Sequence, residues 1–493
     1  MVHGTRVGLR DAELLRDRAF VDGAWAAADD GHTFGVHDPA TGDLIAEVPR
    51  MGAAETRRAI GAAAAAFPAW RATPAAGRAT VLRCWADLMR EHRDDLALLL
   101  THEQGKPLRE SEAEVAYAAA FFEWFGEEAK RIDGDVIPSP QADKRVLVTK
   151  HPIGVCGGIT PWNFPAAMVT RKSAPALAAG NTMVLKPAEQ TPLSALAVAE
   201  LGRRAGLPPG VLSIVTGDAE DAPAIGGELT GNPAVRKLGF TGSTAVGKLL
   251  MRQCADQVRN VSLELGGNAP FIVFADADLD AAVAGAVLCK FRNSGQTCIT
   301  ANRILVHEGV HTAFLERFVA ATRSLTVGAG TDPAPARRPA HRPRGAGEGR
   351  APRGRRAAPR RPAARRRRAP RARPHVLPAH RARRGRPGAA MSNEETFGPV
   401  AGVSRFDSED EAIRAANDTP YGLAAYFYTR DVGRIFRVSE ALEYGILGIN
   451  TGFISTEVAP FGGVKESGLG REGSKYGIND WIELKYLSLG GIA

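Results

Sequence analysis

Residues 181–217, NTMVLKPAEQTPLSALAVAELGRRAGLPPGVLSIVTG, carry the clearest sequence signal for the fold class. The stretch begins with a short apolar run, NTMVLKP, which is typical of a buried strand. A helical pattern, TPLSALAVAELGRRAG, follows, and VLSIVTG then has the character of a second strand. A strand, a helix and another strand in this order predict a parallel sheet with crossover helices.

The same alternation continues along the chain. VRKLGFTGS, TAVGKLLMRQCAD and VSLELGG have the patterns of a strand, a helix and a strand, and APFIVF begins a further strand, helix and strand. Residues 20–50 predict short strands and hairpins, whereas residues 53–131 carry a helical pattern. We therefore expect an α/β fold with parallel sheets.

Length and composition indicate a globular protein with more than one domain. At 493 residues the chain is too long for a single core, and 44% of its residues are hydrophobic. It has no uninterrupted apolar run of about 18 residues, so we expect no membrane span, and its N-terminus lacks the apolar core of a signal peptide. Its five cysteines are scattered without a CxxC pair. This predicts neither a metal site nor a disulfide framework and favours the reducing cytoplasm.

The positive net charge belongs to one segment. Residues 331–390 hold 20 arginines, no lysine and two acids, so they contribute +18 to a chain whose formal charge is +9. The rest of the chain is therefore mildly acidic, at −9. The segment has no apolar periodicity and many prolines, so it cannot bury enough surface to fold alone.

Three interpretations of this Arg-rich segment stay open: a disordered arm for nucleic acid, a charged linker, and a pair of compensating frameshifts. We favour the frameshifts, because out-of-frame reading of GC-rich codons yields Arg, Ala, Pro and Gly, and ordered sequence resumes abruptly at EETFGPV. We accordingly expect no nucleic-acid partner. If the other frames of the gene yield no βαβ-like pattern here, the frameshift hypothesis is wrong.

Cys298 lies in SGQTCITANR, residues 294–303, among small, polar and glycine residues. Structural thiols are usually buried among Leu, Val or Ile, whereas glycine and Ser/Thr let a ligand approach the backbone closely. This residue is therefore either a nucleophile or an ordinary surface thiol. The other cysteines are interpreted as packed thiols: Cys84, Cys156, Cys254 and Cys289.

Two loops after predicted strands have the character of nucleotide sites. In GFTGSTAVG, Gly242 and Gly247 have the separation of the outer glycines in GxGxxG, and free amides at the helix start suit a pyrophosphate. In VLKPAEQTP, Lys186 and Glu189 could hold an adenosine ribose. The alternatives are a simple glycine turn and an exposed pair of loop charges.

Two further motifs carry groups for acyl chemistry. In TPWNFP two prolines fix the loop around Asn163, whose amide could donate to an oxyanion. In LELGGNAP the carboxylate of Glu264 ends an apolar strand, where desolvation would raise its pKa toward that of a general base. The alternatives are a rigid turn with packed aromatics and a salt-bridged structural Glu.

Taken together, Cys298, Glu264 and Asn163 beside two nucleotide-type loops resemble the NAD(P)-dependent aldehyde dehydrogenase superfamily in order and spacing. The resemblance covers residues 20–330 and 394–493 and includes NSGQTC, EETFGPV and PFGGVKESGLGREG. MVTRKSAPALAAGN, CKFRNSGQTC and REGSKYGINDWIELKYL are most similar to succinate-semialdehyde dehydrogenases. The resemblance implies that Cys298 attacks the aldehyde, that Asn163 stabilises the oxyanion, and that Glu264 activates water to hydrolyse a thioester.

The resemblance also implies which residues surround the cofactor and the substrate. The dinucleotide would lie against Trp162, Lys186, Glu189, Gly242, Ser243, Thr244 and Leu265, with Glu395 and Phe397 at the nicotinamide ribose. The distal carboxylate of the substrate would contact Arg171, Arg292 and Ser455.

The resemblance favours oxidation of succinate semialdehyde to succinate. Glutarate semialdehyde, one methylene longer, is the alternative, since one CH₂ changes binding by only about 1–3 kcal/mol. Glu189 would repel a 2′-phosphate, so NAD is expected over NADP, although Lys186 could serve that phosphate. If the Arg-rich segment is real, an inactive pseudoenzyme or an Arg-mediated nucleic-acid binder is the remaining alternative.

The resemblance implies three parts in this α/β fold. A Rossmann-like cofactor domain would take residues 1–131 and 152–265, and a catalytic α/β domain would take residues 266–465. Strands from 132–151 and 478–493 would form a small β-extension. Its exposed sheet edge predicts pairing between subunits, in a homo-oligomer that the resemblance implies is a dimer of dimers.

Overall fold

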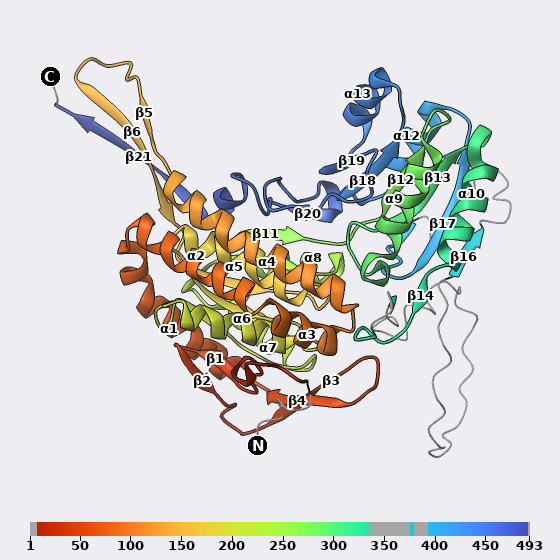
Figure 1. The fold of residues 1–493 in the computed structure, drawn as a ribbon. Coiled ribbons are helices and arrows are strands. Elements are labelled where there is room, and N and C mark those ends of the chain that lie inside the picture. The colour runs from red at the N-terminus through yellow and green to blue at the C-terminus, as the bar shows by residue number, and fades with distance from the viewer. Residues whose placement is uncertain (1–6, 333–335, 338–374, 379–392, 492–493) are drawn as a thin grey trace. The chain divides into compact units, whose positions relative to one another are not determined.

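The computed structural model describes residues 7–332, 336–337, 375–378 and 393–491. Two compact units divide the chain (Figure 1): the first unit comprises Met1–Gly266 and Ser455–Ala493, and the second unit comprises Gly267–Ile454. The first boundary falls one residue after the predicted one, and the second falls about ten residues before the predicted position at 465. Among the described residues, no helix combines the length and the apolar character needed to cross a membrane.

The first unit contains an eight-stranded, largely parallel sheet. In spatial order its strands are β2 (Ala24–Ala26), β1 (Ala19–Val21), β9 (Leu212–Ile214), β8 (Thr182–Lys186), β7 (Val155–Ile159), β10 (Val235–Thr241), β11 (Asn260–Glu264) and β20 (Gly468–Leu469). The strands from β9 to β11 pair in parallel, whereas β1 and β20 join antiparallel. This confirms the parallel sheet that the strand–helix alternation predicted.

The helices of the first unit are α1 (Ala53–Ala72), α2 (Ala75–Glu91), α3 (Arg93–Gln104), α4 (Leu108–Glu128), α5 (Pro165–Ala178), α6 (Pro192–Arg204), α7 (Ala222–Gly231) and α8 (Thr244–Ala255). The helical pattern over 53–131 is confirmed by α1 to α4. The sequence patterns did not predict α5 or α7. Every residue of α5 is buried, so this helix has no polar face to produce a helical period. The segment of α7 contains three glycines, which favour other conformations.

Helix α6 directly follows the loop that carries Lys186 and Glu189, and its first turn is fixed by a buried carboxylate. Glu103, the residue before the last of α3, accepts hydrogen bonds from the amides of Leu193 (2.8 Å) and Ser194 (2.7 Å). Burial raises the pKa of Glu103 to about 8. The carboxylate satisfies donors that a helix start leaves without partners, so the loop before α6 leads into a fixed helix.

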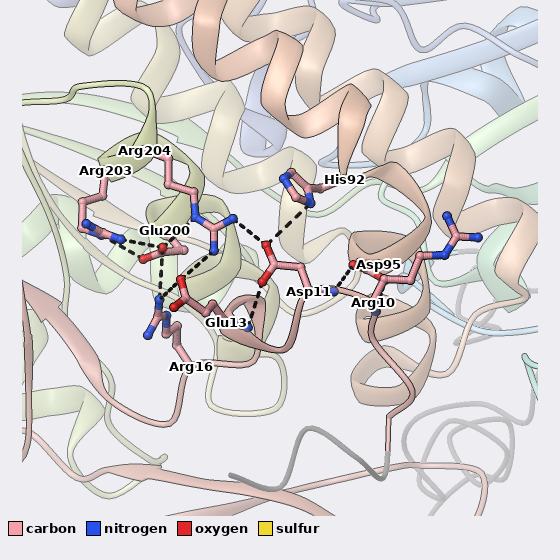
Figure 2. Close-up of polar contacts among 9 residues, drawn as sticks. All are labelled: Arg10, Asp11, Glu13, Arg16, His92, Asp95, Glu200, Arg203 and Arg204. Atoms are coloured by element: carbon pink, nitrogen blue, oxygen red, sulfur yellow. Dashed lines mark hydrogen bonds and ion pairs between the residues drawn. The ribbon is translucent and has the colours of Figure 1, made fainter.

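An ion-pair cluster fixes the other end of α6 to the N-terminal segment (Figure 2). Arg204 bonds to Glu200 at 2.8 Å and to Asp11 at 2.5 Å. The carboxylate of Asp95, on α3, accepts the backbone amide of Asp11 at 2.8 Å. The other residues drawn in this cluster are Arg10, Glu13, Arg16, His92 and Arg203. The described part of the N-terminal segment is therefore held against α3 and α6.

A separate three-stranded sheet in the first unit joins the C-terminal strand to residues 135–152 (Figure 1). Its strands are β5 (Asp135–Ile137), β6 (Lys144–Pro152) and β21 (Ile482–Gly490). β21 pairs antiparallel with β6 along its whole length, which confirms the predicted pairing of RVLVTKHP with the C-terminus. β21 is an edge strand with exposed apolar side chains: Leu484 is 70% exposed and Tyr486 62% exposed. A hairpin of β3 (Thr33–His37) and β4 (Leu44–Pro49) completes this unit.

The second unit contains a six-stranded parallel sheet. In spatial order its strands are β16 (His375–Pro378), β17 (Val400–Phe406), β13 (Ala301–His307), β12 (Ala269–Val273), β18 (Ala424–Tyr428) and β19 (Ile446–Ile449). Its helices include α9 (Leu279–Phe291), α10 (Glu308–Arg323), α12 (Glu409–Asn417) and α13 (Val432–Ala441), and β14 (Thr326–Val327) pairs with β15 (Ala336–Arg337). The strand, helix and strand predicted from APFIVF onward are confirmed as β12, α9 and β13.

The Arg-rich segment 331–390 lies mostly outside the described residues. Two short stretches within it are described as strands, β15 and β16, and β16 pairs in parallel with β17. The frameshift hypothesis for this segment stays a prediction.

Candidate active site

The predicted catalytic residues divide between the two units: Asn163 and Glu264 belong to the first unit and Cys298 to the second. Asn163 lies in the loop from β7 into α5, with Pro161 before it and Pro165 beginning the helix. It is buried, with 5% of its surface exposed. A proline on each side fixes φ and removes a backbone donor, so the loop around Asn163 has little conformational freedom.

A buried ion pair, absent from the sequence analysis, anchors this loop. The ammonium of Lys106 pairs with Glu114 and donates to the backbone carbonyl of Asn163 over 2.9 Å. The other carboxylate oxygen of Glu114 accepts hydrogen bonds from the amides of Ala166 (3.0 Å) and Ala167 (3.3 Å), in the first turn of α5. Neither charged residue lies in a recognisable motif, so the sequence carried no signal for this contact.

Glu264 ends β11, and its backbone carbonyl accepts a hydrogen bond from Gly242 over 3.0 Å. Its side chain is 3% exposed, and neither carboxylate oxygen accepts a hydrogen bond from any residue in the described part of the chain. A Cβ at Gly462 would lie 2.9 Å from Glu264 Oε1, so glycine leaves room for the carboxylate. Burial raises the pKa of Glu264 well above its usual range, and the negative charge of Glu472 raises it further. This is the environment of a proton acceptor rather than of a structural salt bridge.

The neighbouring carboxylate of Glu472 has the opposite environment. Its two oxygens lie 2.6 Å from Arg171 Nη2 and 2.7 Å from Lys172 Nζ. Burial opposes the ionisation of Glu472, but the two cations hold its pKa below the usual range. Arg171, predicted to bind the substrate, is thus 3% exposed and paired within the protein, and its role toward substrate stays a prediction. Lys172 and Glu472 were not among the predicted residues.

The lysine of the predicted ribose site is not an exposed loop charge. Lys186 is 4% exposed, donates to the carbonyl of Pro187 over 3.2 Å and lies 3.9 Å from Glu189. Burial lowers the pKa of Lys186, and the charge of Glu189 partly offsets that effect. The carboxylate of Glu189 is partly exposed and accepts a hydrogen bond from Gln190 over 2.6 Å. It therefore remains open to ribose hydroxyls.

The predicted phosphate turn begins α8. Ser243 caps the helix, and its hydroxyl accepts the amide of Val246 over 3.4 Å, while Thr244 is the first helical residue. A Cβ at Gly247 would lie 2.4 Å from Leu265, so glycine lets the helix pack on the segment after β11. The positive end of a helix dipole next to a strand end suits a pyrophosphate. Together with Lys186 and Glu189, these residues fit a dinucleotide.

In the second unit, Cys298 lies in a loop between α9 and β13 whose backbone is fixed by close contacts. A Cβ at Gly267 would lie 2.2 Å from the carbonyl oxygen of Cys298, so only glycine fits there. The carbonyl of Ile299 accepts hydrogen bonds from Tyr426 Oη (2.8 Å) and Cys289 Sγ (3.7 Å). These contacts hold the backbone directly after the thiol, and a positioned nucleophile needs such a fixed backbone.

The exposure of the cysteines separates Cys298 from three others. Cys298 is partly exposed, whereas Cys156, Cys254 and Cys289 are buried, which confirms the packed-thiol prediction for those three. The prediction is wrong for Cys84, which is exposed. It lies on α2 between buried Leu82 and Trp85, on the outward face of the helix.

The remaining predicted residues of the second unit are Glu395, Phe397 and Arg292. Glu395 Oε1 accepts the amide of Gly267 over 3.1 Å, and withdrawal from water raises the pKa of Glu395 to about 7. Phe397 has a φ of 40°, a conformation that a bulky residue adopts only when its surroundings impose it. The guanidinium of Arg292 lies 5.0 Å from the ring centroid of Phe453, and this cation–π contact orients it.

The predicted site residues therefore form two sets. The first unit holds Asn163, Glu264, Trp162, Lys186, Glu189, Gly242, Ser243, Thr244, Leu265, Arg171 and Ser455. The second unit holds Cys298, Arg292, Glu395 and Phe397. The catalytic and binding roles of these residues stay predictions.

Known proteins resemble this chain over nearly its whole length. The aldehyde dehydrogenase family model matches residues 25–349 and 371–487. Glutarate-semialdehyde dehydrogenase of Pseudomonas aeruginosa is 58% identical over 503 residues, which cover 98% of this chain and 100% of that protein. The NADP(+) succinate-semialdehyde dehydrogenase GabD of Escherichia coli is 56% identical, covering 98% and 99%. The crystal structure of succinate-semialdehyde dehydrogenase from Burkholderia pseudomallei superposes with a TM-score of 0.90 at 54% identity, covering 98% and 100%.

Proposed function

Since the chain belongs to the aldehyde dehydrogenase family, we propose that it oxidises a semialdehyde with a distal carboxylate to the dicarboxylate, with NAD(P)+ as the oxidant. The observation that carries this proposal is the environment of Glu264. Its carboxylate is 3% exposed, and within the described residues it accepts no hydrogen bond. A buried carboxylate in this state is suited to take a proton from water.

The first half of the proposed reaction takes place at Cys298. Its thiolate attacks the aldehyde carbon and forms a C–S bond, and the carbonyl oxygen becomes the oxyanion of a thiohemiacetal. The side-chain amide of Asn163 and the backbone N–H of Cys298 stabilise this charge, and one such donor contributes about 3 kcal/mol. The dinucleotide, when bound, supplies the acceptor for the hydride that leaves the former aldehyde carbon, and a thioester remains on Cys298.

Glu264 acts in the second half of the reaction. It takes a proton from a water molecule, whose oxygen attacks the thioester carbon; the C–S bond then breaks and the thiolate of Cys298 returns. The product leaves as a carboxylate. Because Glu264 must be ionised to accept the proton, its raised pKa makes hydrolysis faster as the pH rises through that pKa.

For the substrate we place glutarate semialdehyde first and succinate semialdehyde, which the sequence analysis favoured, second. The relative with 58% identity is named for the five-carbon substrate and the one with 56% for the four-carbon substrate. Since one methylene changes binding by only about 1–3 kcal/mol, we expect both to react. Arg171 is paired with Glu472, so we assign the distal carboxylate chiefly to Arg292, with Ser455 as a second donor.

Substrates of matched length test this proposal. We expect kcat/KM to be highest with glutarate semialdehyde, lower with succinate semialdehyde, and at least about 100-fold lower with pentanal, which lacks the carboxylate and its charge-assisted hydrogen bonds. Arg292→Met should lower kcat/KM for both semialdehydes and leave pentanal unchanged. Cys298→Ala should abolish NADH formation. Equal rates with pentanal, or activity in Cys298→Ala, would show that the proposal is wrong.

We further propose that NAD is preferred over NADP, because Glu189 would accept a hydrogen bond from a ribose 2′-hydroxyl and repel a 2′-phosphate. The E. coli relative is named for NADP(+), so the preference needs a direct test. Glu189→Gln removes the repulsion and should lower the ratio of kcat/KM for NAD to that for NADP about tenfold, roughly the effect of one charged hydrogen bond. An unchanged ratio contradicts this assignment.

We also propose a cytoplasmic homotetramer, arranged as a dimer of dimers. The five free cysteines are consistent with a reducing compartment, and the exposed apolar edge strand β21 is a surface that proteins normally cover. Light scattering should give the mass of a tetramer, and the double variant Leu484→Glu, Tyr486→Glu should give a smaller assembly. A monomeric wild type contradicts the proposal.

A further inference from the structure

Lys290, in the last turn of α9, is fully buried, with 0% exposed. Its ammonium donates to Asn302 Oδ1 over 3.2 Å and to Thr396 Oγ1 over 3.3 Å. The Thr396 hydroxyl donates to the same oxygen of Asn302 over 2.5 Å. Both acceptors are neutral, and an ammonium in such a place is costly to keep charged. Burial accordingly lowers the pKa of Lys290 to about 7.

These contacts continue into a closed ring. Asn302 Nδ2 donates to the carbonyl of Gly267 over 3.4 Å, and the amide of Gly267 donates to Glu395 Oε1 over 3.1 Å. Glu395 precedes Thr396 in the chain, which closes the ring back to Lys290. Gly267 is also the residue against which the carbonyl of Cys298 packs without room for a Cβ. The ring therefore links the segment at Glu395 to the nucleophile loop within one unit.

The charge of Lys290 also affects the ionisation of Glu395. The titratable groups that face Lys290 are Cys289, on the same helix, and Glu395. Withdrawal from water raises the pKa of Glu395 to about 7, whereas its hydrogen bond from Gly267 and the charge of Lys290 lower it. Removing the ammonium would therefore leave the Glu395 carboxyl protonated over a wider pH range.

We propose that Lys290 is a positioning residue for cofactor binding: through Asn302 and Thr396 it holds the carboxylate of Glu395 in the place and the ionised state in which that group binds the nicotinamide ribose. The inference rests on the proposed function and on the prediction from the family resemblance that Glu395 contacts this ribose. An ionised carboxylate accepts hydrogen bonds from ribose hydroxyls more strongly than a protonated one does. Lys290 acts on the cofactor through Glu395 and does not contact the reacting atoms.

The test measures the dissociation constant of NAD for the intact enzyme by isothermal titration calorimetry at pH 6.5 and pH 9.5, below and above the pKa of Lys290. Lys290→Met replaces the ammonium with a side chain of similar length, and Thr396→Val removes one acceptor while keeping the shape. Lys237→Met is the matched control, because Lys237 is another fully buried lysine, on β10 of the first unit and outside the ring. Kinetic constants for NAD and thermal midpoints are measured alongside.

We expect Lys290→Met to weaken NAD binding about tenfold at pH 6.5, where the Lys290 ammonium is largely charged, the effect of one charged hydrogen bond. Its binding should approach that of the wild type at pH 9.5, where Glu395 ionises without help. KM for NAD should rise more than kcat falls. Thr396→Val should show a smaller loss and Lys237→Met none.

Two outcomes would overturn the inference. One is a folded Lys290→Met enzyme with the wild-type dissociation constant at both pH values; the other is a loss of equal size at both pH values that Lys237→Met shares, which would indicate a purely structural role. If Lys290→Met does not fold, wild-type NAD binding in Thr396→Val has the same meaning. Failure of the proposed function is distinguishable, because the wild type itself would then neither bind NAD(P) nor oxidise a semialdehyde.

Discussion

Glu114 and Glu264 are two glutamates of the first unit with the same exposure, 3% each, and opposite surroundings. Glu114 pairs with the ammonium of Lys106 and accepts two backbone amides. No residue in the described part of the chain donates a hydrogen bond to the carboxylate of Glu264. Burial of a charge is costly in both places, but only at Glu114 is that cost offset by direct partners. The first arrangement fixes a loop, and the second leaves a proton acceptor ready to react.

The contacts of Glu472 explain why nearby cations do not pair with Glu264. Arg171 and Lys172 pair with Glu472 rather than with Glu264. The cations lower the pKa of Glu472, while its remaining negative charge contributes to the raised pKa of Glu264. Two neighbouring buried carboxylates thus have pKa values shifted in opposite directions, an arrangement that separates a fixed charge from an acid–base group.

We expect the largest effect on activity from substitution of Glu264, the proposed proton acceptor. Glu264→Gln keeps the shape but cannot take a proton from water, so we expect kcat to fall about 10²- to 10⁴-fold. Hydride transfer precedes this step, so rapid mixing should still show a burst of about one NADH per active site, as expected when a covalent intermediate accumulates. A lost burst together with lost turnover would indicate that Glu264 acts earlier than proposed.

The next largest effect is expected on stability, from substitution of Glu114. Glu114→Gln leaves Lys106 buried without its charge partner, and we expect the free energy of unfolding to fall by about 3–5 kcal/mol, measured by urea denaturation. Glu127→Gln, on the same helix, is the matched control. Glu127 forms surface pairs with Lys130 at 2.8 Å and with Arg83 at 3.8 Å, and their loss should cost less than about 1 kcal/mol. Similar losses in both variants would contradict the assignment of Glu114 as the anchor of the Asn163 loop.

A smaller effect is expected on the pH dependence of kcat, from substitution of Glu472. Glu472→Gln removes a negative charge near Glu264 and releases the charges of Arg171 and Lys172, and both changes lower the pKa of Glu264. Hydrolysis needs the ionised form, so the acidic limb of the kcat profile should move to lower pH. The measurement is steady-state turnover across the pH range in which the variant stays folded. A shift to higher pH, or an unmoved limb, contradicts the proposed coupling.

The smallest effect concerns a helix cap near the surface. Ser243 caps α8 with one hydrogen bond to the amide of Val246, whereas Glu114 contacts two amides of α5 from a buried position. Ser243→Ala should therefore lower the free energy of unfolding by only about 1 kcal/mol, again measured in urea. A loss as large as that of Glu114→Gln would show that burial does not set the difference between these helix starts.

Local sequence patterns were enough to predict the α/β class, the parallel pairing of strands in the central sheet, the pairing of the C-terminal strand and the family, because strand and helix periods and short motifs are local properties of the chain. They did not predict α5, since a helix buried on all sides has no amphipathic period.

Only the tertiary structure decided which charges meet. Lys106 contacts the carbonyl of Asn163, 57 residues away, and Lys172 contacts Glu472, 300 residues away. Lys290 was likewise absent from the prediction, because its partner Thr396 comes from a segment 106 residues away. A buried charge is stable only beside particular partners, and the fold rather than the local pattern brings those partners together.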